Sequence, residues 1–262
     1  MKCPICNSNK NTKIFTASNV HGRHQINSQK IAILKCDECS CIFPKIKTDK
    51  NFYKKYYPKN YQTSTKNKFL IKIYQNFNYH YKNKLIPQNS ILLDVGCGQG
   101  DFIKQLPKGI NAYGIDINPL INKNIIKDDF LKHRFSKKFN IITFWHSLEH
   151  FKNPKKALDK AINLLKPNGK ILISIPNTNS FAFNLGQRNW FHLDPPRHLF
   201  LPNSQNIKKL FPKNSKINLY FHSFEFPLDL FWSLKKHPYL RIIYPILKIF
   251  DHETMMVVYQ KN

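Results

Sequence analysis

Short apolar runs alternate with amphipathic stretches in the middle of this 262-residue chain. Apolar runs bounded by polar residues or glycine are typical of buried strands, and they occur at residues 91–95, 112–117, 139–145 and 170–175. Apolar positions at helical spacing lie between them, at residues 99–106 and 154–165. This alternation predicts an α/β domain in which a parallel sheet is covered by helices on both faces.

The flanking segments extend this pattern in both directions. Residues 216–224 and 253–260 predict two further strands, with an interrupted helix over 228–250 between them. Upstream, residues 45–88 are rich in lysine and aromatic side chains, and their apolar positions recur at helical spacing. We therefore expect a helical lead-in over 45–88 and a main domain over 89–262. A basic and aromatic groove for nucleic acid is the alternative interpretation of the lead-in.

Two Cys-x-x-Cys pairs mark the first 44 residues. Cys3 and Cys6 form one pair, and Cys36 and Cys39 form the other. Each pair can present two thiolates from one tight turn, and two such pairs supply a tetrahedral Zn²⁺ site. Four thiolates leave no coordination position for water, so the spacing predicts a structural zinc in a small zinc-ribbon-like unit over residues 1–44. The plainer alternative is that these cysteines are small buried hydrophobic residues.

A glycine-rich turn follows the first predicted strand of the main domain. Asp94 lies at the strand end, and Gly96, Gly98 and Gly100 follow at alternate positions. Glycine lets the backbone approach a nucleotide-like ligand because no Cβ stands in the way. Asp116 closes the next predicted strand about 20 residues later, where a ribose-binding carboxylate belongs.

Five motifs follow one another from residue 92 to residue 170: LLDVGCGQGDF, YGIDINP, KDDF, FNIITFWHSLEH and LLKPNGK. With these motifs the chain resembles the class I S-adenosylmethionine-dependent methyltransferases, and in particular their ubiquinone-methyltransferase-like branch. The resemblance implies a Rossmann-like sheet and S-adenosylmethionine as the methyl donor. A dinucleotide-dependent dehydrogenase is disfavoured, because its turn reads G-x-G-x-x-G.

The resemblance also implies roles for single residues at the strand ends. Gly96, Gly98 and Gly100 would cradle the methionine and ribose portion of the cofactor, beside Asp94, and Asp116 would hold the ribose hydroxyls. Asp129 and Phe130, after a third strand, would face the adenine. Trp145 and His146, at the tip of the fourth strand, would form a wall at the methionine end.

The segment WFHLDPPRHL at residues 190–199 lies between the predicted fifth and sixth strands. It and the Cys-x-x-Cys unit resemble bacterial methyltransferases that act on sugars or on surface-glycan and lipid precursors, which implies an acceptor pocket here. A neutral histidine suits removal of the acceptor proton at pH 7, and our first choice is His198, followed by His192 and His150. Arg197 binds an anionic acceptor group or pairs with Asp194. Glu149 and His150 have a structural role or bind substrate or metal.

The charge of the chain is extreme, with 42 Lys and Arg against 15 Asp and Glu, a net charge of +27. This balance favours a polyanionic partner such as nucleic acid or an anionic membrane, but a lysine-rich composition can also arise without one. The polar, cysteine-containing N-terminus does not match a secretory signal, so we expect a cytoplasmic protein. The apolar segment at 239–250 is too short to cross a membrane but long enough to lie on one.

Three functions are compatible with these observations. The first is transfer of a methyl group from S-adenosylmethionine to a small-molecule, sugar or lipid or glycan-precursor acceptor. The second is an RNA methyltransferase, which the charge favours. The third is a non-catalytic zinc-ribbon binding protein that retains the nucleotide fold, and the intact glycine turn argues against it.

Overall fold

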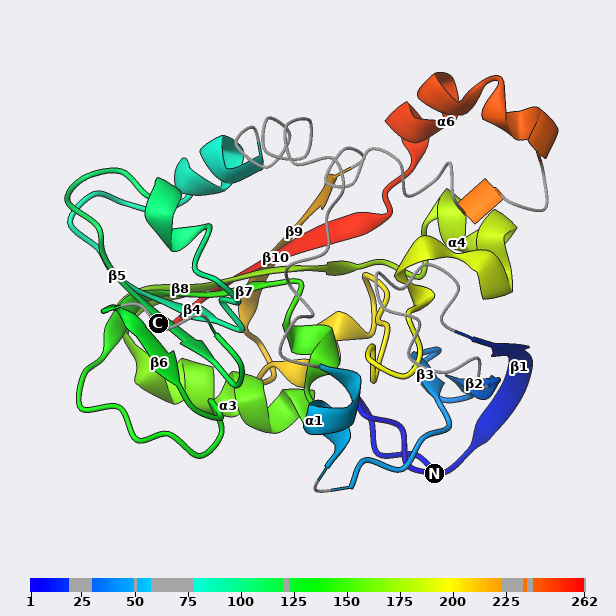
Figure 1. Cartoon of the computed structure of the whole chain (residues 1–262), viewed down its shortest axis with the longest axis horizontal. Coiled ribbons are helices and arrows are strands. Elements are labelled where there is room, and N and C mark those ends of the chain that lie inside the picture. Colours follow the sequence, from blue (N-terminus) through cyan, green and yellow to red (C-terminus); the bar gives the residue numbers. More distant parts are fainter. Residues whose placement is uncertain are drawn as a thin grey trace.

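The large sheet has seven strands and the small sheet has three (Figure 1). The computed structural model describes residues 1–18, 30–49, 51–57, 78–119, 123–222, 233–234 and 238–261. The large sheet has the spatial order β6-β5-β4-β7-β8-β10-β9. Its strands are β4 (Ile91–Val95), β5 (Asn111–Asp116), β6 (Ile125–Lys127), β7 (Phe139–Trp145), β8 (Leu165–Pro176), β9 (Lys216–His222) and β10 (Thr254–Gln260).

The first five strands of this sheet are parallel, as the sequence predicts, but β10 is not. It lies between β8 and β9 and pairs antiparallel with both. The parallel part agrees with the prediction from residues 91–175, and the sequence pattern gave no direction for the last two strands. A continuous apolar run such as Met255–Val257 shows that a strand is buried on both faces, and it carries no information on strand direction.

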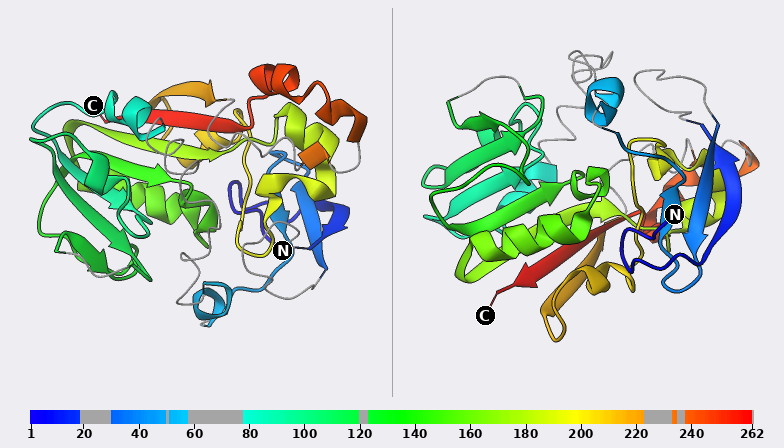
Figure 2. Two further views of the ribbon diagram at one scale, coloured as in Figure 1. Left: turned by 45° about the horizontal axis from the view of Figure 1, so that its top comes forward. Right: turned by 90° about the horizontal axis from the view of Figure 1, so that it is seen from below.

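Apolar side chains cover both faces of the large sheet. Leu93 of β4 packs in the cluster that contains Ala157 and Leu158 of helix α3 (Pro154–Leu164). Its neighbour Leu92 points to the opposite face, where it packs with Ile86. Figure 2 shows α3 and the helical residues 78–83 on the two sides of the sheet. The α/β class with helices on both faces is confirmed.

Helix α3 also begins and ends as the sequence predicts. Asn153 precedes it, and its side chain accepts a hydrogen bond of 2.9 Å from the backbone amide of Lys156. The helix predicted at residues 99–106 is wrong: only the 3₁₀ turn η1 (Ile103–Gln105) forms there. Gly100 has φ +72°, and Leu106 is extended before Pro107, so too few residues remain for an α-helix.

The described part of the lead-in contains the short helix α1 (Phe52–Tyr56) and the helical residues 78–83. Residues 58–77 of this lead-in lie outside the described residues, as do residues 228–232 and 235–237 of the interrupted helix expected at 228–250. The second half of that helix is present as η7 (Pro238–Arg241) and α6 (Tyr244–Phe250). Between β8 and β9 lie α4 (Phe181–Gly186), η3 (Gln187–Asn189), η4 (Phe191–Leu193) and η5 (Ile207–Leu210). No helix within the described ranges is long and apolar enough to cross a membrane.

The small sheet packs against the segment that follows β8. It consists of the antiparallel strands β1 (Asn11–Ala17), β2 (Ile31–Cys36) and β3 (Ile42–Pro44). Ile42 and Leu201 exchange backbone hydrogen bonds of 3.1 and 2.7 Å. Cys3 and Phe43 lie in the same buried cluster as Phe200. The cysteine-bearing unit and the large sheet therefore share one hydrophobic core.

Candidate functional site

The carboxyl ends of β6, β5, β4 and β7 lie side by side at one edge of the sheet, because these strands are neighbours and parallel. Open α/β sheets bind ligands at this edge. The predicted cofactor residues follow these strand ends, and the turn η2 (Leu148–His150) follows β7.

The glycine turn and Asp116 are in direct contact. The Gly98 amide donates a hydrogen bond of 3.0 Å to Oδ2 of Asp116, and the Asn118 amide donates one of 2.8 Å to Oδ1. Gly96 has φ +73°, and a Cβ at this position would lie 2.5 Å from the Cβ of Ser147. A side chain is therefore excluded at Gly96 by both backbone conformation and space. The structure brings together the turn and the acid that the sequence associates with cofactor binding.

Asp94 is turned into the sheet. Its side chain is buried, and Oδ1 accepts a hydrogen bond of 2.7 Å from Oγ1 of Thr143 on the neighbouring strand β7. Burial raises the pKa of this carboxyl to about 7, even though the Thr143 hydrogen bond works in the opposite direction. Asp94 thus links β4 to β7 directly beneath the glycine turn.

Asp129 and Phe130 follow β6 but have different surroundings. Oδ1 of Asp129 accepts a hydrogen bond of 2.9 Å from the Leu131 amide at the surface turn. The ring of Phe130 is 3% exposed and meets Phe144 and Phe151 edge-on. Phe130 is therefore part of the core beside the strand end, and its contact with adenine stays a prediction.

Trp145 and His146 end β7. The Trp145 ring packs edge-on against Phe102, at a centroid distance of 5.4 Å, and the Lys82 ammonium lies 4.5 Å from its centre. His146 has φ +49°, and its amide donates to the Ser174 carbonyl over 2.9 Å. Its ring stacks on that of His192 with centroids 6.2 Å apart. Two of the predicted histidines are thus brought together.

A cluster of ionisable side chains, Glu149, His150 and His198, lies next to His146. Glu149 is completely buried, and neither carboxylate oxygen has a hydrogen-bond donor among the described residues. Oε1 lies 3.6 Å from Nδ1 of His146 and 4.0 Å from Nε2 of His198. The ligand atoms of Glu149, His150 and His198 all lie within 4.8 Å of one another, so these three residues could also hold a metal ion.

A hydrogen bond to a backbone carbonyl fixes the tautomer of His198. Its Nδ1 lies 2.6 Å from the His192 carbonyl, which only accepts, so Nδ1 carries the proton and Nε2 keeps its lone pair. Nδ1 of His150 lies 3.1 Å from the Arg197 carbonyl and 2.8 Å from the Tyr57 hydroxyl, which can donate or accept. Loss of water contact lowers the pKa of both histidines to about 4, which leaves them neutral at pH 7.

The carboxylate of Glu149 is charged under the same conditions. Burial acts to raise its pKa, but the contact with His146 and the neighbouring His150 and His198 outweigh burial and hold the pKa at about 2. The cluster therefore combines one buried negative charge with two neutral imidazoles. Burial disfavours an imidazolium here, and the carboxylate of Glu149 offsets part of that cost when His198 accepts a proton.

These pKa values predict a loss of stability in mild acid. A histidine whose pKa is near 4 in the folded protein and about 6.5 in the unfolded chain favours unfolding when it becomes protonated. Its contribution to stability is complete above pH 6.5 and declines as the pH falls toward 4. We expect the melting temperature to drop across this window and the drop to be smaller in His198→Gln. Equal slopes for the two proteins would contradict the assignment.

Arg197 and His192 make contacts that stabilise the conformation of the 190–199 loop. Arg197 is buried and forms two hydrogen bonds with the Asp194 carboxylate, of 2.9 and 2.7 Å. Of the two expectations for Arg197, the structure shows the pair with Asp194. His192 is buried, and its Nε2 lies 3.7 Å from Oε1 of Glu253.

Sequence reasoning missed three residues that contact this site. The Tyr53 hydroxyl donates to the His150 carbonyl over 3.0 Å, and the Tyr57 hydroxyl lies 2.8 Å from Nδ1 of His150. Glu253 accepts a hydrogen bond of 2.6 Å from Nε1 of Trp190. The tyrosines that cluster after residue 52 were the signal from which these contacts could have been predicted. Their helical spacing indicated only a helix that faces the core, and it did not indicate which residues the hydroxyl groups contact.

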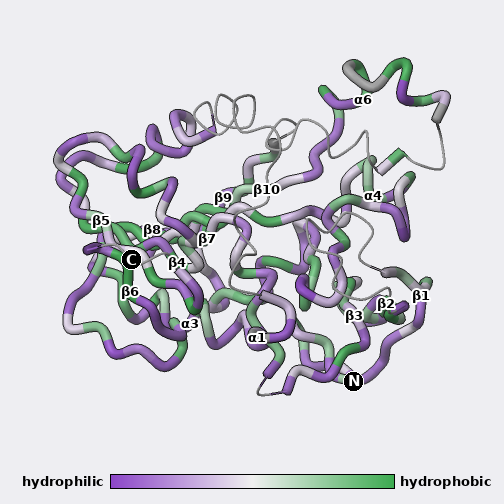
Figure 3. Tube along the Cα trace, viewed as in Figure 1, coloured by the Kyte–Doolittle hydropathy of each residue, from purple (hydrophilic) through white to green (hydrophobic). Residues whose placement is uncertain are grey.

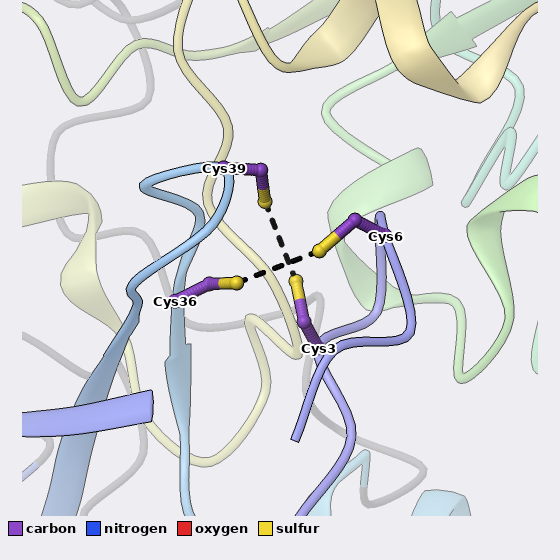
Figure 4. A group of neighbouring side chains, drawn as sticks. All are labelled: Cys3, Cys6, Cys36 and Cys39. Carbon is purple, nitrogen blue, oxygen red and sulfur yellow. Dashed lines mark hydrogen bonds between the residues drawn. The ribbon is translucent and has the colours of Figure 1, made fainter. Parts of the chain in front are cut away.

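The four cysteines of the N-terminal unit converge on one point. Figure 4 shows their sulfurs facing one another from two turns. The Sγ atoms of Cys3 and Cys39 are 3.6 Å apart, those of Cys6 and Cys36 are 3.5 Å apart, and all four lie within 4.8 Å of one another. A zinc ion with Zn–S bonds of about 2.3 Å requires sulfurs about 3.8 Å apart. The cluster therefore fits a tetrahedral Zn²⁺ ion.

Comparison with known proteins assigns the family. Residues 69–215, more than half of the chain, match the family described as "Methyltransferase domain". The chain belongs to this family. The resemblance to class I S-adenosylmethionine-dependent methyltransferases is confirmed, together with the Rossmann-like fold.

Curated relatives and a solved structure are similar over parts of the chain. The ubiquinone biosynthesis O-methyltransferase of Erwinia tasmaniensis is 29% identical over 105 residues, 34% of this chain and 43% of the relative. That of Glaesserella parasuis is 31% identical over 115 residues, 36% and 48% of the two chains. The methyltransferase chain thus spans less than half the length of these relatives. The [4+2]-cyclase SpnF has the same fold, with a TM-score of 0.51 and 14% identity over 76% of this chain and 84% of its own.

Proposed function

We propose that the protein transfers a methyl group from S-adenosylmethionine to a small-molecule acceptor. The observation that carries this proposal is the contact of the glycine turn with Asp116 at the carboxyl edge of the sheet, in a chain of the methyltransferase family. Gly96, Gly98 and Gly100 would receive the methionine and ribose portion, and Asp116 would bind the ribose hydroxyls. The bound cofactor supplies an electrophilic methyl group on a sulfonium.

The protein's own residues would orient the acceptor and take up its proton. As the new bond to the methyl carbon forms and the carbon–sulfur bond breaks, the acceptor loses a proton. Nε2 of His198 has a lone pair for this proton, and the charge of Glu149 at 4.0 Å would stabilise the imidazolium. His150 places a second neutral imidazole in the same cluster, and the Tyr57 hydroxyl at its Nδ1 would hold the ring in place.

We propose that the acceptor is a sugar or a lipid or glycan precursor. Two observations support a small acceptor over RNA. The 31% identical relative is named for ubiquinone biosynthesis, a small-molecule pathway. In addition, the candidate bases His198 and His192 are only 8% and 4% exposed, so a compact acceptor group fits this site better than a polynucleotide.

The N-terminal cluster would hold one structural zinc ion through Cys3, Cys6, Cys36 and Cys39. The four thiolates would complete the coordination shell and leave no position for a reacting water. Cys41 would take no part, because its Sγ faces the carbonyls of Ile42 and Leu201 at 3.7 and 3.8 Å. The zinc would then stabilise the surface on which residues 199–206 rest.

The proposal is tested by supplying S-adenosylmethionine with a labelled methyl group to the purified protein together with fractionated cell extract. We expect label in the small-molecule, glycan or lipid fraction, and much less label when Asp116→Ala replaces the natural protein at the same low cofactor concentration. Label confined to RNA would establish the alternative of an RNA methyltransferase. Cofactor binding without label in any fraction would leave the non-catalytic alternative.

The assignment of Asp116 makes a quantitative prediction. Asp116→Ala should weaken S-adenosylmethionine binding by about 1.5 to 3 kcal/mol, the range for a lost hydrogen bond to a charged group. Isothermal titration calorimetry measures this change, and circular dichroism checks that the domain remains folded. Asp101→Ala is the matched control, because Asp101 is an exposed acid on the same turn and pairs only with Lys104 among the described residues. Equal affinity in the two variants would refute the assignment.

A further inference from the structure

The segment 239–250 exposes a concentration of large apolar side chains. Among the described residues, Ile242 is 84% exposed, Phe250 73% and Ile246 59%. On α6, Ile246, Ile249 and Phe250 share one face, because residues three and four apart are neighbours on a helix. Figure 1 shows α6 at the periphery of the molecule, beyond α4, and Figure 3 shows apolar residues along it. Monomeric proteins seldom leave so many neighbouring apolar side chains uncovered.

The opposite side of this segment attaches it to the protein. Leu240 and Leu247 pack against the cluster that contains Phe183 and Trp190. Lys248 points inward, is 1% exposed, and places Nζ 3.4 Å from Oε2 of Glu253. The inner face thus holds the segment in a fixed position while its outer face stays apolar.

The segment carries more positive than negative charge outside its buried face. In the sequence, Lys235, Lys236 and Arg241 precede α6, whereas Asp251 after the helix is buried beside Lys248. The whole chain has the same bias, with a net charge of +27. Exposed apolar side chains on a short helix of a strongly cationic chain fit an interface with anionic lipid headgroups. A helix of seven residues is about 10 Å long, so α6 would lie along the surface of a bilayer.

We propose that the exposed apolar face of 239–250 docks on an anionic lipid bilayer. The apolar side chains would enter the boundary between headgroups and acyl chains, and the net positive charge would attract the anionic surface. Docking would also affect the loop that contains His192 and His198, because Glu253 connects this loop to α6. Oε1 of Glu253, the partner of Lys248, accepts from Trp190 and lies 3.7 Å from His192, whose carbonyl holds His198.

The test is cosedimentation of the full chain with vesicles of phosphatidylcholine, with and without about 30% phosphatidylglycerol. We expect binding to the anionic vesicles, weaker binding to the neutral ones, and release at about 0.5 M salt. The double variant Ile246→Ser with Phe250→Ser should bind about tenfold or more weakly. Ile14→Ser with Phe221→Ser is the matched control, because it removes one exposed isoleucine and one exposed phenylalanine elsewhere. Thermal melts check that both variants are folded.

Three outcomes would overturn the proposal. Failure of the natural protein to sediment with anionic vesicles is the first, and equal binding by the two double variants is the second. The third is concentration-dependent dimerisation that Ile246→Ser with Phe250→Ser abolishes, which would assign the surface to a second copy of the chain. None of these outcomes depends on methyl transfer, so they leave the proposed activity untouched.

Discussion

Replacing Cys36 and Cys39 together by serine is expected to release one zinc ion per chain and to cause a large loss of stability. Zinc binding supplies much of the folding free energy of small zinc units, because the site does not exist in the unfolded chain. Here the unit shares its core with the main domain. Ile42 is hydrogen-bonded to Leu201, and the Asn206 amide donates to the Cys39 carbonyl over 2.9 Å.

The loss should therefore spread beyond residues 1–44. A loss of about 3 kcal/mol or more would lower the melting temperature by about 6 to 12 °C in a protein of this size. Elemental analysis of the purified protein measures the zinc content, and differential scanning calorimetry measures the melting temperature. Cys41→Ser is the control, because Cys41 is buried in the same unit but its sulfur faces carbonyl groups. Protein purified without zinc, or zinc retained after the double replacement, would exclude this metal site.

His198→Ala should lower turnover by about 10² to 10⁴ while cofactor affinity stays the same. The reason is that Nε2 of His198 has its lone pair free beside the charge of Glu149, while Nδ1 is held by the His192 carbonyl. Glu149→Gln should also reduce turnover, because it removes the charge that stabilises the imidazolium and keeps the shape of the side chain. Steady-state kinetics with an identified acceptor and cofactor titrations measure the two effects separately.

A packing role for His198 has a different signature. In that case His198→Ala would lower the melting temperature and leave turnover per folded molecule nearly unchanged, which would move the assignment to His150 or His192. His252→Ala is the control, because His252 is exposed. A metal ion held by Glu149, His150 and His198 would have another signature. In that case a chelator would abolish turnover while the zinc of the cysteine site stays bound, and adding a different metal ion would restore turnover.

The sequence predicted the elements whose signals are local. Strand β7 and helix α3 agree with their apolar patterns to within one residue, because burial on a sheet face and the Asn153 cap act over short distances. The contact between the glycine turn and Asp116 follows from equally local signals. Strands β4 and β5 are adjacent and parallel, so the residues at their carboxyl ends, including Gly98 and Asp116, lie next to each other.

The sequence did not predict features that depend on contacts between distant segments. The direction of β10 is set by the strands on either side of it. The partners of Glu149 come from η2 and from a loop about 50 residues farther along the chain, and the tyrosines that contact His150 lie about 95 residues before it. The 99–106 segment shows a further limit. Its apolar spacing is helical, but the glycine conformation before it and Pro107 after it decide the backbone.

The position of β10 has a consequence for how the protein matures during synthesis. Strands β4 to β8 can pair as they emerge, but β9 pairs only with β10 within the part of the chain that the structure describes. Glu253, at the start of β10, also anchors Trp190 in the loop that contains His198. A nascent chain would thus pair the strands of the proposed cofactor edge first, and the loop that contains His198 would gain its anchor only after Glu253 has been synthesised.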